Sequence, residues 1–301
     1  MFNFNIHNQV IKTQNESILI QVKREDLIHS FISGNKYRKL KYNIEKAKEI
    51  NANSLLTFGG AFSNNIAAVA SAGKVYGFNT IGIIRGDELK FKKELNPTLQ
   101  FAKNCGMHLE YVSRADYRNK TNVDFIKNLR NKFDDFYLIP EGGTNDLAVK
   151  GCEEILQPED MDFDYICCAV GTGGTISGII NASKKHQQVL GFPALKNNFL
   201  QQDIRRFANQ ENWKLITDYH FGGYGKINSE LVTFINTFKK NHKIPLDPIY
   251  TGKMMYGILD LVEKGFFPKG SKVLAIHTGG LQGIDGMNKL LKRKKLPLIE
   301  K

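Results

Sequence analysis

Residues 165–175 read YICCAVGTGGT, an apolar run that leads straight into a glycine-rich segment. An uninterrupted apolar strand is typical of parallel sheets, because helices cover both of their faces. The glycines that follow allow backbone N–H groups to converge at the start of a helix, where they favour a phosphate group. A plain tight turn would produce the same pattern, and the segment is neither a Walker sequence nor a six-residue dinucleotide fingerprint.

The rest of the chain alternates between strand-like and helix-like segments. Apolar residues with helical spacing alternate with short apolar runs that end at glycine or proline. This alternation predicts an α/β fold with parallel sheets flanked by helices. Strands are expected at 54–58, 80–84, 108–112, 136–140, 165–170, 189–192 and 273–277, and helices at 37–47, 66–76, 97–102, 123–131, 148–156, 176–183, 230–239 and 254–264.

Composition excludes several classes of protein. The 301 residues are 42% apolar, which is enough for a large core in one or two domains. Four cysteines lack paired spacing, and Cys167 and Cys168 lie inside the apolar strand, so we expect buried thiols in the reducing cytoplasm. No metal signature is present, no apolar run approaches the roughly 20 residues of a membrane span, and residues 1–7 do not predict a signal peptide.

The net charge of +12 leaves a nucleic-acid partner as an alternative. However, the lysines are spread along the chain, and no zinc finger, helix-turn-helix or aromatic RNA-binding motif accompanies them. The densest basic run, residues 292–295, is interpreted as the solvated end of a helix. We therefore expect no nucleic-acid partner.

Lys36 lies at the start of a predicted helix, in the segment SGNKYRKL at 33–40. A lysine attacks an aldehyde only when its amine is neutral, and burial or a neighbouring cation lowers its pKa. Lys39 is one helical turn away on the same face. Spacing alone would equally suit one surface lysine among many.

Four other segments contain candidate binding groups. Residues 63–65, Ser-Asn-Asn, open a helix and are either an N-cap or a grip for a carboxylate. Tyr250 precedes a helix and could be a packing residue, whereas Tyr224 lies in a glycine-rich loop where an exposed ring has little packing role. Thr278 follows a strand, at the edge of a parallel sheet where ligands gather.

Taken together, these segments resemble the pyridoxal-phosphate enzymes of the tryptophan-synthase β fold (fold type II), in the group of D-cysteine desulfhydrase and 1-aminocyclopropane-1-carboxylate deaminase. The resemblance runs from residues 22–27 to 277–280 and is most specific at 34–40 and 247–253. It implies two α/β domains with pyridoxal 5'-phosphate in the cleft between them. The expected larger domain comprises residues 1–47 plus 145–301, and the smaller one 48–144. It also implies a small amino-acid substrate and a homodimer.

The resemblance assigns roles to individual residues. Lys36 would carry the cofactor as a Schiff base, Asn64 would bind the cofactor's ring oxygen, and Ser63 would meet the substrate carboxylate. Tyr224 and Tyr250 would line the substrate side. The phosphate would be held by Gly171, Thr172, Gly173, Gly174 and Thr175.

Two positions bear on the substrate. The deaminases typically have glutamate where this chain has Thr251 and leucine where it has Thr278, whereas the desulfhydrases usually have threonine at both. A hydroxyl at the pyridine nitrogen, from Thr278 or alternatively Thr251, makes the cofactor a weaker electron sink than a carboxylate would. Elimination of a thiol tolerates this, which favours D-cysteine desulfhydration over the deaminase reaction. Phe62 replaces the usual glutamine before Ser63 and leaves the substrate open.

Overall fold

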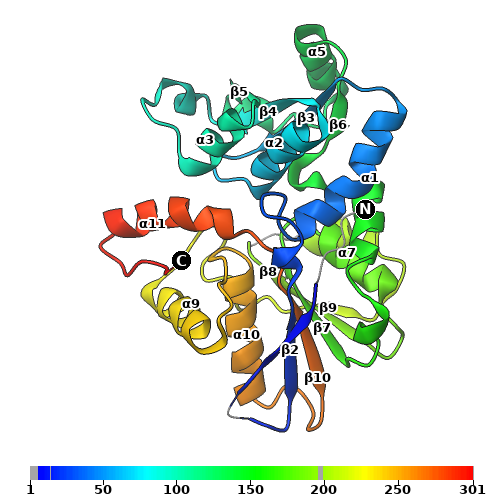
Figure 1. Cartoon of the computed structure of the whole chain (residues 1–301), viewed down its shortest axis with the longest axis vertical. Helices are drawn as coiled ribbons and strands as arrows, with labels where there is room; N and C mark the ends of the chain where they lie inside the picture. Colours follow the sequence, from blue (N-terminus) through cyan, green and yellow to red (C-terminus); the bar gives the residue numbers. More distant parts are fainter. Residues whose placement is uncertain (1–5, 14, 196–198, 301) are drawn as a thin grey trace.

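The computed structural model describes residues 6–13, 15–195 and 199–300, so most of the N-terminal segment used to assess a signal peptide lies outside the described residues. Two separate sheets form, the smaller above the larger in Figure 1. This confirms the predicted α/β fold with parallel-rich sheets flanked by helices. The division into 1–47 plus 145–301 and 48–144 stays a prediction.

The larger sheet has the strand order β1-β2-β10-β7-β8-β9. All of its pairs are parallel except β1 with β2, which is an antiparallel pair that the sequence did not predict. Its strands are β1 (Asn8–Ile11), β2 (Leu19–Lys23), β7 (Tyr165–Val170), β8 (Gln188–Pro193), β9 (Trp213–Leu215) and β10 (Lys272–Ile276). Strands β1, β2 and β9 escaped prediction because each is short and mixes polar with apolar residues.

The smaller sheet is entirely parallel, in the order β5-β4-β3-β6. Its strands are β3 (Ser54–Gly59), β4 (Asn79–Arg85), β5 (His108–Val112) and β6 (Tyr137–Ile139).

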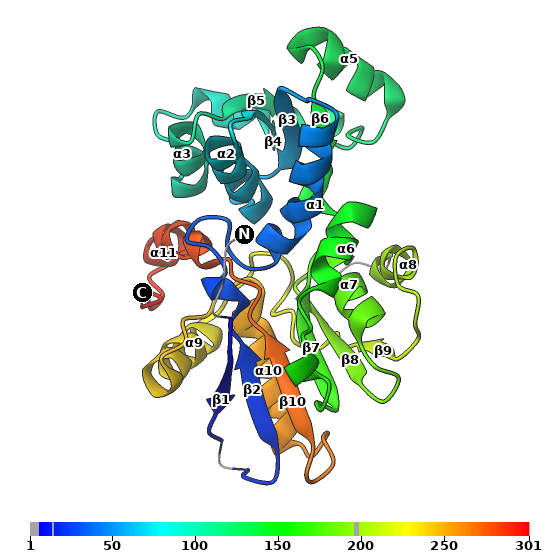
Figure 2. The same cartoon turned by 45° about the vertical axis from the view of Figure 1, so that its right-hand side comes forward.

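Helices cover both faces of both sheets (Figures 1 and 2). They are α1 (Asn35–Glu49), α2 (Asn64–Tyr76), α3 (Pro97–Asn104), α4 (Arg114–Tyr117), α5 (Val123–Phe133), α6 (Asp146–Glu153), α7 (Gly174–Ala182), α8 (Leu200–Arg205), α9 (Ser229–His242), α10 (Thr251–Glu263) and α11 (Ile284–Arg293). Short 3-10 helices occupy Glu25–Leu27, Asp87–Phe91, Glu141–Gly143, Pro158–Asp160 and Leu281–Gly283. Among the described residues, no helix is long and apolar enough to cross a membrane.

Strand β7 shows why its sequence is apolar throughout. Cys167 packs into the core shared with α9 and α10, whereas Cys168 packs into the core on the other face, with α7 and α8. Successive side chains of a strand point to opposite faces, and both faces are covered here. Both thiols are buried and free, as expected.

Asparagine and serine side chains begin several helices. Ser63, Asn96, Asn122, Asn145 and Asn228 each accept a backbone N–H of the first turn that follows. Such caps satisfy donors that have no partner within the helix. The basic run at 292–295 is exposed at the end of α11, as interpreted from the sequence.

Helix α1 joins the two layers, because it packs against α6 beside the larger sheet and against α2 beside the smaller one (Figure 2). The α6 contact is very close. A Cβ atom added to Gly151 would lie 2.0 Å from the carbonyl oxygen of Arg38 in α1.

We therefore expect Gly151→Ala to push α6 away from α1 and lower the free energy of unfolding by about 1–3 kcal/mol, the usual effect of overpacking. Chemical denaturation would measure the change. Gly283→Ala is the matched control, because nothing lies within 4 Å of its added Cβ. Equal stability of both variants would contradict the close packing of α1 on α6.

Candidate active site

The predicted site residues gather around one cavity between the two sheets. Its walls come from segments that follow the carboxyl ends of β3, β6, β7 and β10, the edge at which ligands bind parallel sheets. Ten predicted residues line it: Lys36, Ser63, Asn64, Gly171, Thr172, Gly173, Thr175, Tyr224, Tyr250 and Thr278. Gly174 is buried as the first residue of α7, and Thr251 does not line the cavity.

Lys36 extends into this cavity from the first turn of α1. Burial, and after it the positive charge of Lys39, lowers the pKa of Lys36 from 10.5 to about 7. The Nζ atom donates to Oδ1 of Asn35 at 3.2 Å, and the Asn35 amide donates to the Thr175 hydroxyl at 2.8 Å. At neutral pH a large share of the Lys36 amine is therefore uncharged and nucleophilic.

The start of α1 is held directly against the loop that carries Thr278. The Asn35 N–H donates to the Thr278 carbonyl at 3.3 Å. Gly34 has a φ of 59°, and a Cβ there would lie 2.0 Å from the same oxygen. Only glycine permits this approach, which brings Lys36 and Thr278 to one cavity.

Lys39 lies at the glycine-rich end of the cavity. It is 2% exposed, and its Nζ donates to the Gly142 carbonyl at 3.0 Å and to the Thr144 hydroxyl at 2.9 Å. The Thr144 and Thr172 hydroxyls lie 2.6 Å apart, which links this cation to the loop at 171–175. Thr144 and Gly142 were not predicted. Their signal was the glycine-containing segment EGGT at 141–144 directly after a strand.

Ser63 and Asn64 start α2 on the opposite wall. The Ser63 Oγ accepts the Ile66 N–H at 3.3 Å, so the N-cap interpretation holds, and the residue also faces the cavity. The Asn64 Oδ1 accepts a hydrogen bond from the Gln282 side chain at 3.0 Å. That contact orients the amide from the segment before α11.

Tyr250 is positioned by a buried carboxylate that the sequence analysis did not single out. Asp247 accepts the backbone N–H groups of Ile249, Tyr250 and Thr251 at 2.7–3.2 Å. Burial raises the pKa of Asp247, although these bonds favour its ionised form. The turn that they form brings the Tyr250 ring over Gly171, where an added Cβ would lie 3.2 Å from the phenol oxygen.

The geometry does not favour the alternative role of Thr251 at the pyridine nitrogen, which stays a prediction. Thr251 is fully buried, and its hydroxyl both donates to Asp247 at 3.0 Å and accepts the Asp247 N–H at 2.9 Å. Thr278 lines the cavity and is the hydroxyl that remains available for that role. Sequence spacing could not separate the two, because each threonine lies in a short turn-forming segment beside the site.

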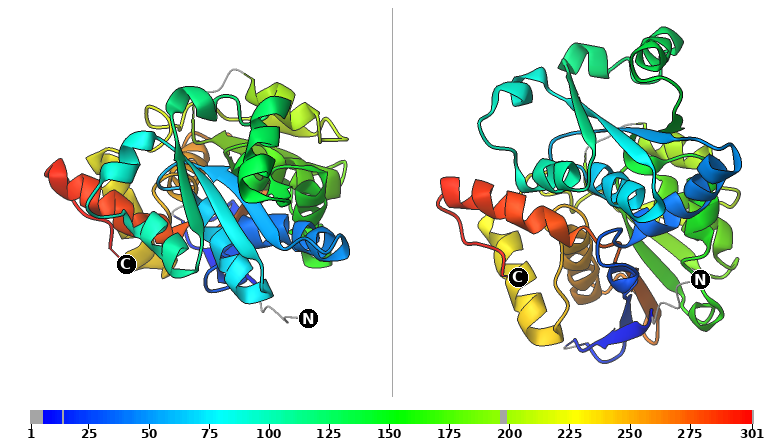
Figure 3. Two further views of the ribbon diagram at one scale, coloured as in Figure 1. Left: turned by 90° about the horizontal axis from the view of Figure 1, so that it is seen from above. Right: turned by 45° about the horizontal axis from the view of Figure 1, so that its top comes forward.

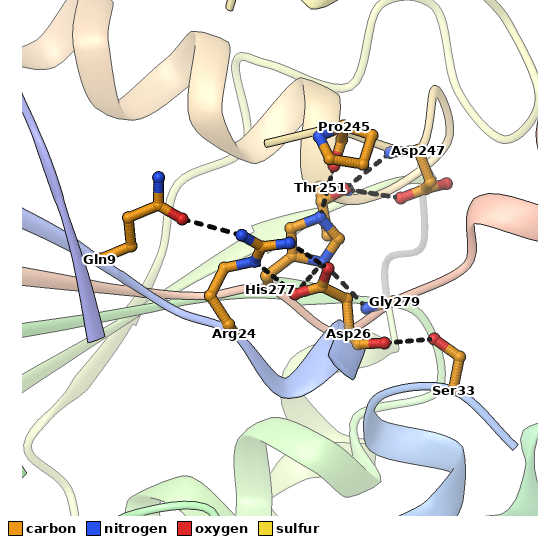
Figure 4. Close-up of polar contacts among 9 residues, drawn as sticks. All are labelled: Gln9, Arg24, Asp26, Ser33, Pro245, Asp247, Thr251, His277 and Gly279. Carbon is orange, nitrogen blue, oxygen red and sulfur yellow. Dashed lines mark hydrogen bonds and ion pairs between the residues drawn. The ribbon is translucent and has the colours of Figure 1, made fainter. Parts of the chain in front are cut away.

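The Thr278 loop rests on a buried polar network, shown in Figure 4. The His277 ring accepts the Gly279 N–H at 3.2 Å, and its other nitrogen donates to the Pro245 carbonyl at 2.7 Å. These partners imply the Nε2–H form of the ring. Asp26 lies 3.7 Å from the ring and accepts two hydrogen bonds from Arg24, each of 2.8 Å. These contacts hold His277 and Gly279, the two neighbours of Thr278 in the chain, and none of them involves the Thr278 hydroxyl.

The residues present fit pyridoxal phosphate. Lys36 supplies a neutral amine, and the first turn of α7 supplies backbone N–H groups at the glycine loop, where Gly173 has a φ of 86°. Lys39 and the hydroxyls of Thr144, Thr172 and Thr175 add a cation and donors at the same end, which suits a phosphate. Within the described residues, no group of three or more His, Cys, Asp or Glu side chains could hold a metal ion.

Comparison with known proteins agrees with this fit. The family model for pyridoxal-phosphate dependent enzymes matches residues 9–279. The chain belongs to this family. Within it, the chain falls in the group of 1-aminocyclopropane-1-carboxylate deaminases and D-cysteine desulfhydrases, which confirms the resemblance and the cofactor.

Three similar proteins illustrate this group. A Pyrococcus furiosus protein, provisionally named 1-aminocyclopropane-1-carboxylate deaminase, is 33% identical over 88% of this chain and 85% of its own length. The bifunctional D-cysteine desulfhydrase/1-aminocyclopropane-1-carboxylate deaminase of Arabidopsis thaliana is 31% identical over 87% of this chain and 72% of its own. The crystal structure of an ACC deaminase homologue superimposes with a TM-score of 0.85 at 26% identity, over 97% and 94% of the two chains.

The lowered pKa of Lys36 predicts how this pyridoxal-phosphate enzyme captures its cofactor. Only the neutral amine reacts, so the rate of covalent capture should rise about tenfold per pH unit and level off above the pKa of about 7. The absorbance change on mixing cofactor-free protein with pyridoxal phosphate measures this rate. Lys36→Ala should show no covalent capture.

Lys39→Met tests the cause of the shift. Removing the neighbouring positive charge should raise the pKa of Lys36 and move the midpoint to higher pH. Lys41→Met is the matched control, since Lys41 lies on the same helix but pairs with Glu154. A midpoint near the ordinary lysine value in the unaltered protein would refute the buried-amine interpretation.

Proposed function

We propose that the chain catalyses β-elimination from D-cysteine, in which D-cysteine and water give pyruvate, hydrogen sulfide and ammonia. The observation that carries the proposal is the chemistry of the cavity wall. Among the described residues that line the cavity none is acidic, and Thr278 presents a hydroxyl there. The carboxylate of the 247–253 segment, Asp247, already accepts hydrogen bonds from three backbone N–H groups and from the Thr251 hydroxyl.

When bound, pyridoxal phosphate supplies an aldehyde for the amino group and a ring that withdraws electrons from the α-carbon. A hydroxyl beside the ring nitrogen supports less electron withdrawal than a carboxylate. Release of a sulfide requires less of it, because sulfide is a good leaving group. This difference favours D-cysteine over the cyclopropane amino acid.

In the proposal Lys36 first holds the cofactor and then, as a free amine, takes the proton from the substrate α-carbon. A pKa of about 7 suits this exchange, because the group can both accept and return a proton near neutral pH. Ser63 receives the substrate carboxylate at the start of α2, and Asn64 meets the cofactor's ring oxygen.

Tyr250 acts as the proton donor on the substrate side. Burial, and after it neighbouring Tyr224, raises the pKa of Tyr250 well above its usual value, so the phenol stays protonated. The rings of Tyr224 and Tyr250 meet edge to face with centroids 6.2 Å apart. A raised pKa makes the phenol a weaker acid but keeps its hydrogen in place, and in the proposal Tyr250 donates that hydrogen to the departing sulfur while Tyr224 closes the substrate side of the cavity.

A second candidate is deamination of 1-aminocyclopropane-1-carboxylate. It is favoured by the bifunctional Arabidopsis relative, whose name includes both activities. This substrate has no α-hydrogen, so ring opening needs a nucleophile or base at a ring carbon and a stronger electron sink. The two activities have different products and can be measured side by side.

We expect sulfide and pyruvate from D-cysteine, and Tyr250→Phe should lower sulfide release by roughly 100-fold or more, as for loss of a general acid. Sulfide and keto-acid assays on D- and L-amino acids and the cyclopropane amino acid provide the measurement. Tyr165→Phe is the control, because Tyr165 packs against Phe267 away from the cavity. Formation of 2-oxobutyrate from the cyclopropane amino acid, without sulfide from D-cysteine, would reverse the assignment.

We further propose, from the resemblance, that the enzyme is a cytoplasmic homodimer that acts on a small amino acid. Sedimentation equilibrium of the purified chain would measure the oligomeric state.

A further inference from the structure

A second cavity adjoins the candidate active site. Its volume is about 410 Å³, within the range of roughly 300–1,000 Å³ typical of small-ligand sites. It lies between α3, which covers the smaller sheet, and α11, and these two helices lie next to each other in Figures 1 and 3. Much of its wall is apolar, from Phe62, Leu95, Leu99, Ile249, Met287 and Leu290, and the charged residues Lys92, Glu94, Lys289 and Arg293 also line it.

Three segments line both cavities. Phe62 lines the second cavity and Ser63 the first, Ile249 lines the second and Tyr250 the first, and Tyr224 lines both. The second cavity therefore begins directly behind the side chains that we assign to the substrate. A substrate side chain that extends past Tyr224 and Tyr250 would point toward it.

Phe62 makes the shared wall apolar. Its ring packs against Gly286 of α11, where an added Cβ would lie 2.8 Å from two ring carbons. The ring is nevertheless 46% exposed, and Tyr224 and Leu290 are 47% and 36% exposed. When an apolar group of a ligand covers such solvent-exposed apolar surface, the free energy of binding becomes more favourable.

We infer that this cavity binds an apolar substituent on the leaving group of the substrate, so that the enzyme takes S-substituted D-cysteines. The inference rests on the proposed function. In the reaction, the Cβ–S bond breaks, the thiolate takes a proton, and water releases ammonia: R–S–CH₂–CH(NH₃⁺)–COO⁻ + H₂O gives R–SH, pyruvate and NH₄⁺. Tyr250 protonates the sulfur while the R group occupies the second cavity.

Binding is tested first, on the full chain with its cofactor. 3-Phenylpropanoate and propanoate share a carboxylate and lack the amine needed to displace Lys36. The difference between their affinities, measured by calorimetry, therefore gives the contribution of the phenyl ring. We expect the phenyl compound to bind about 10- to 100-fold more tightly. Leu290→Gln should remove most of that difference. Leu298→Gln should not, because this leucine is 46% exposed and lies outside the cavity.

Turnover is tested with S-benzyl-D-cysteine and D-cysteine, comparing kcat/KM. We expect a ratio of about 10 or more in favour of the benzyl substrate, reduced by Leu290→Gln and unchanged by Leu298→Gln. Equal binding of the two carboxylates, with turnover of D-cysteine, would overturn the inference and leave the proposed function standing. Tighter, Leu290-dependent binding without turnover of either cysteine would overturn the proposed function and with it the substrate assignment.

Discussion

The arrangement of the site centres on the Lys36 amine, which is buried between two sheets and has a lowered pKa. A buried ammonium loses its hydration, so the pKa falls, and the adjacent Lys39 cation lowers it further. Both lysines project from α1, the helix that packs on both layers. The position of one helix therefore determines the nucleophile, the phosphate end of the cavity and the contact between the layers.

Buried polar groups beneath the cavity hold the remaining parts of the site. Asp247 orders the turn that presents Tyr250. His277 accepts the Gly279 N–H (Figure 4) and so holds the loop that carries Thr278. A buried polar side chain without a hydrogen-bond partner destabilises the folded state. Asp247 and His277 each find backbone partners close to a site residue. Because leaving such a buried group unpaired would be unfavourable, these hydrogen bonds hold the turn and the loop in one conformation.

The same geometry separates chemistry from specificity. The groups that we propose to hold the cofactor and move protons line the first cavity, whereas Phe62 and residues of α11 line the second. If the second cavity binds part of the substrate as we infer, substitutions there alter which amino acid binds without altering the cofactor site. Phe62, one of the residues at which this chain departs from the usual pattern, lies at that boundary.

Local sequence was sufficient for much of the fold, and the family resemblance supplied most of the site. The apolar strand at 165–170, the helix-start signals and the glycine-rich turn depend on neighbours in the chain, and ten of the twelve predicted site residues line one cavity. The features that the sequence did not predict depend on contacts between residues far apart in the chain. Strand β1 is recognisable only through its pairing with β2, Thr251 was separated from Thr278 only by the hydrogen bonds of Asp247, and Thr144 reaches Thr172 from another sheet. The lowered pKa of Lys36 is of the same kind, because burial is a property of the surrounding fold and not of the residues beside it in sequence.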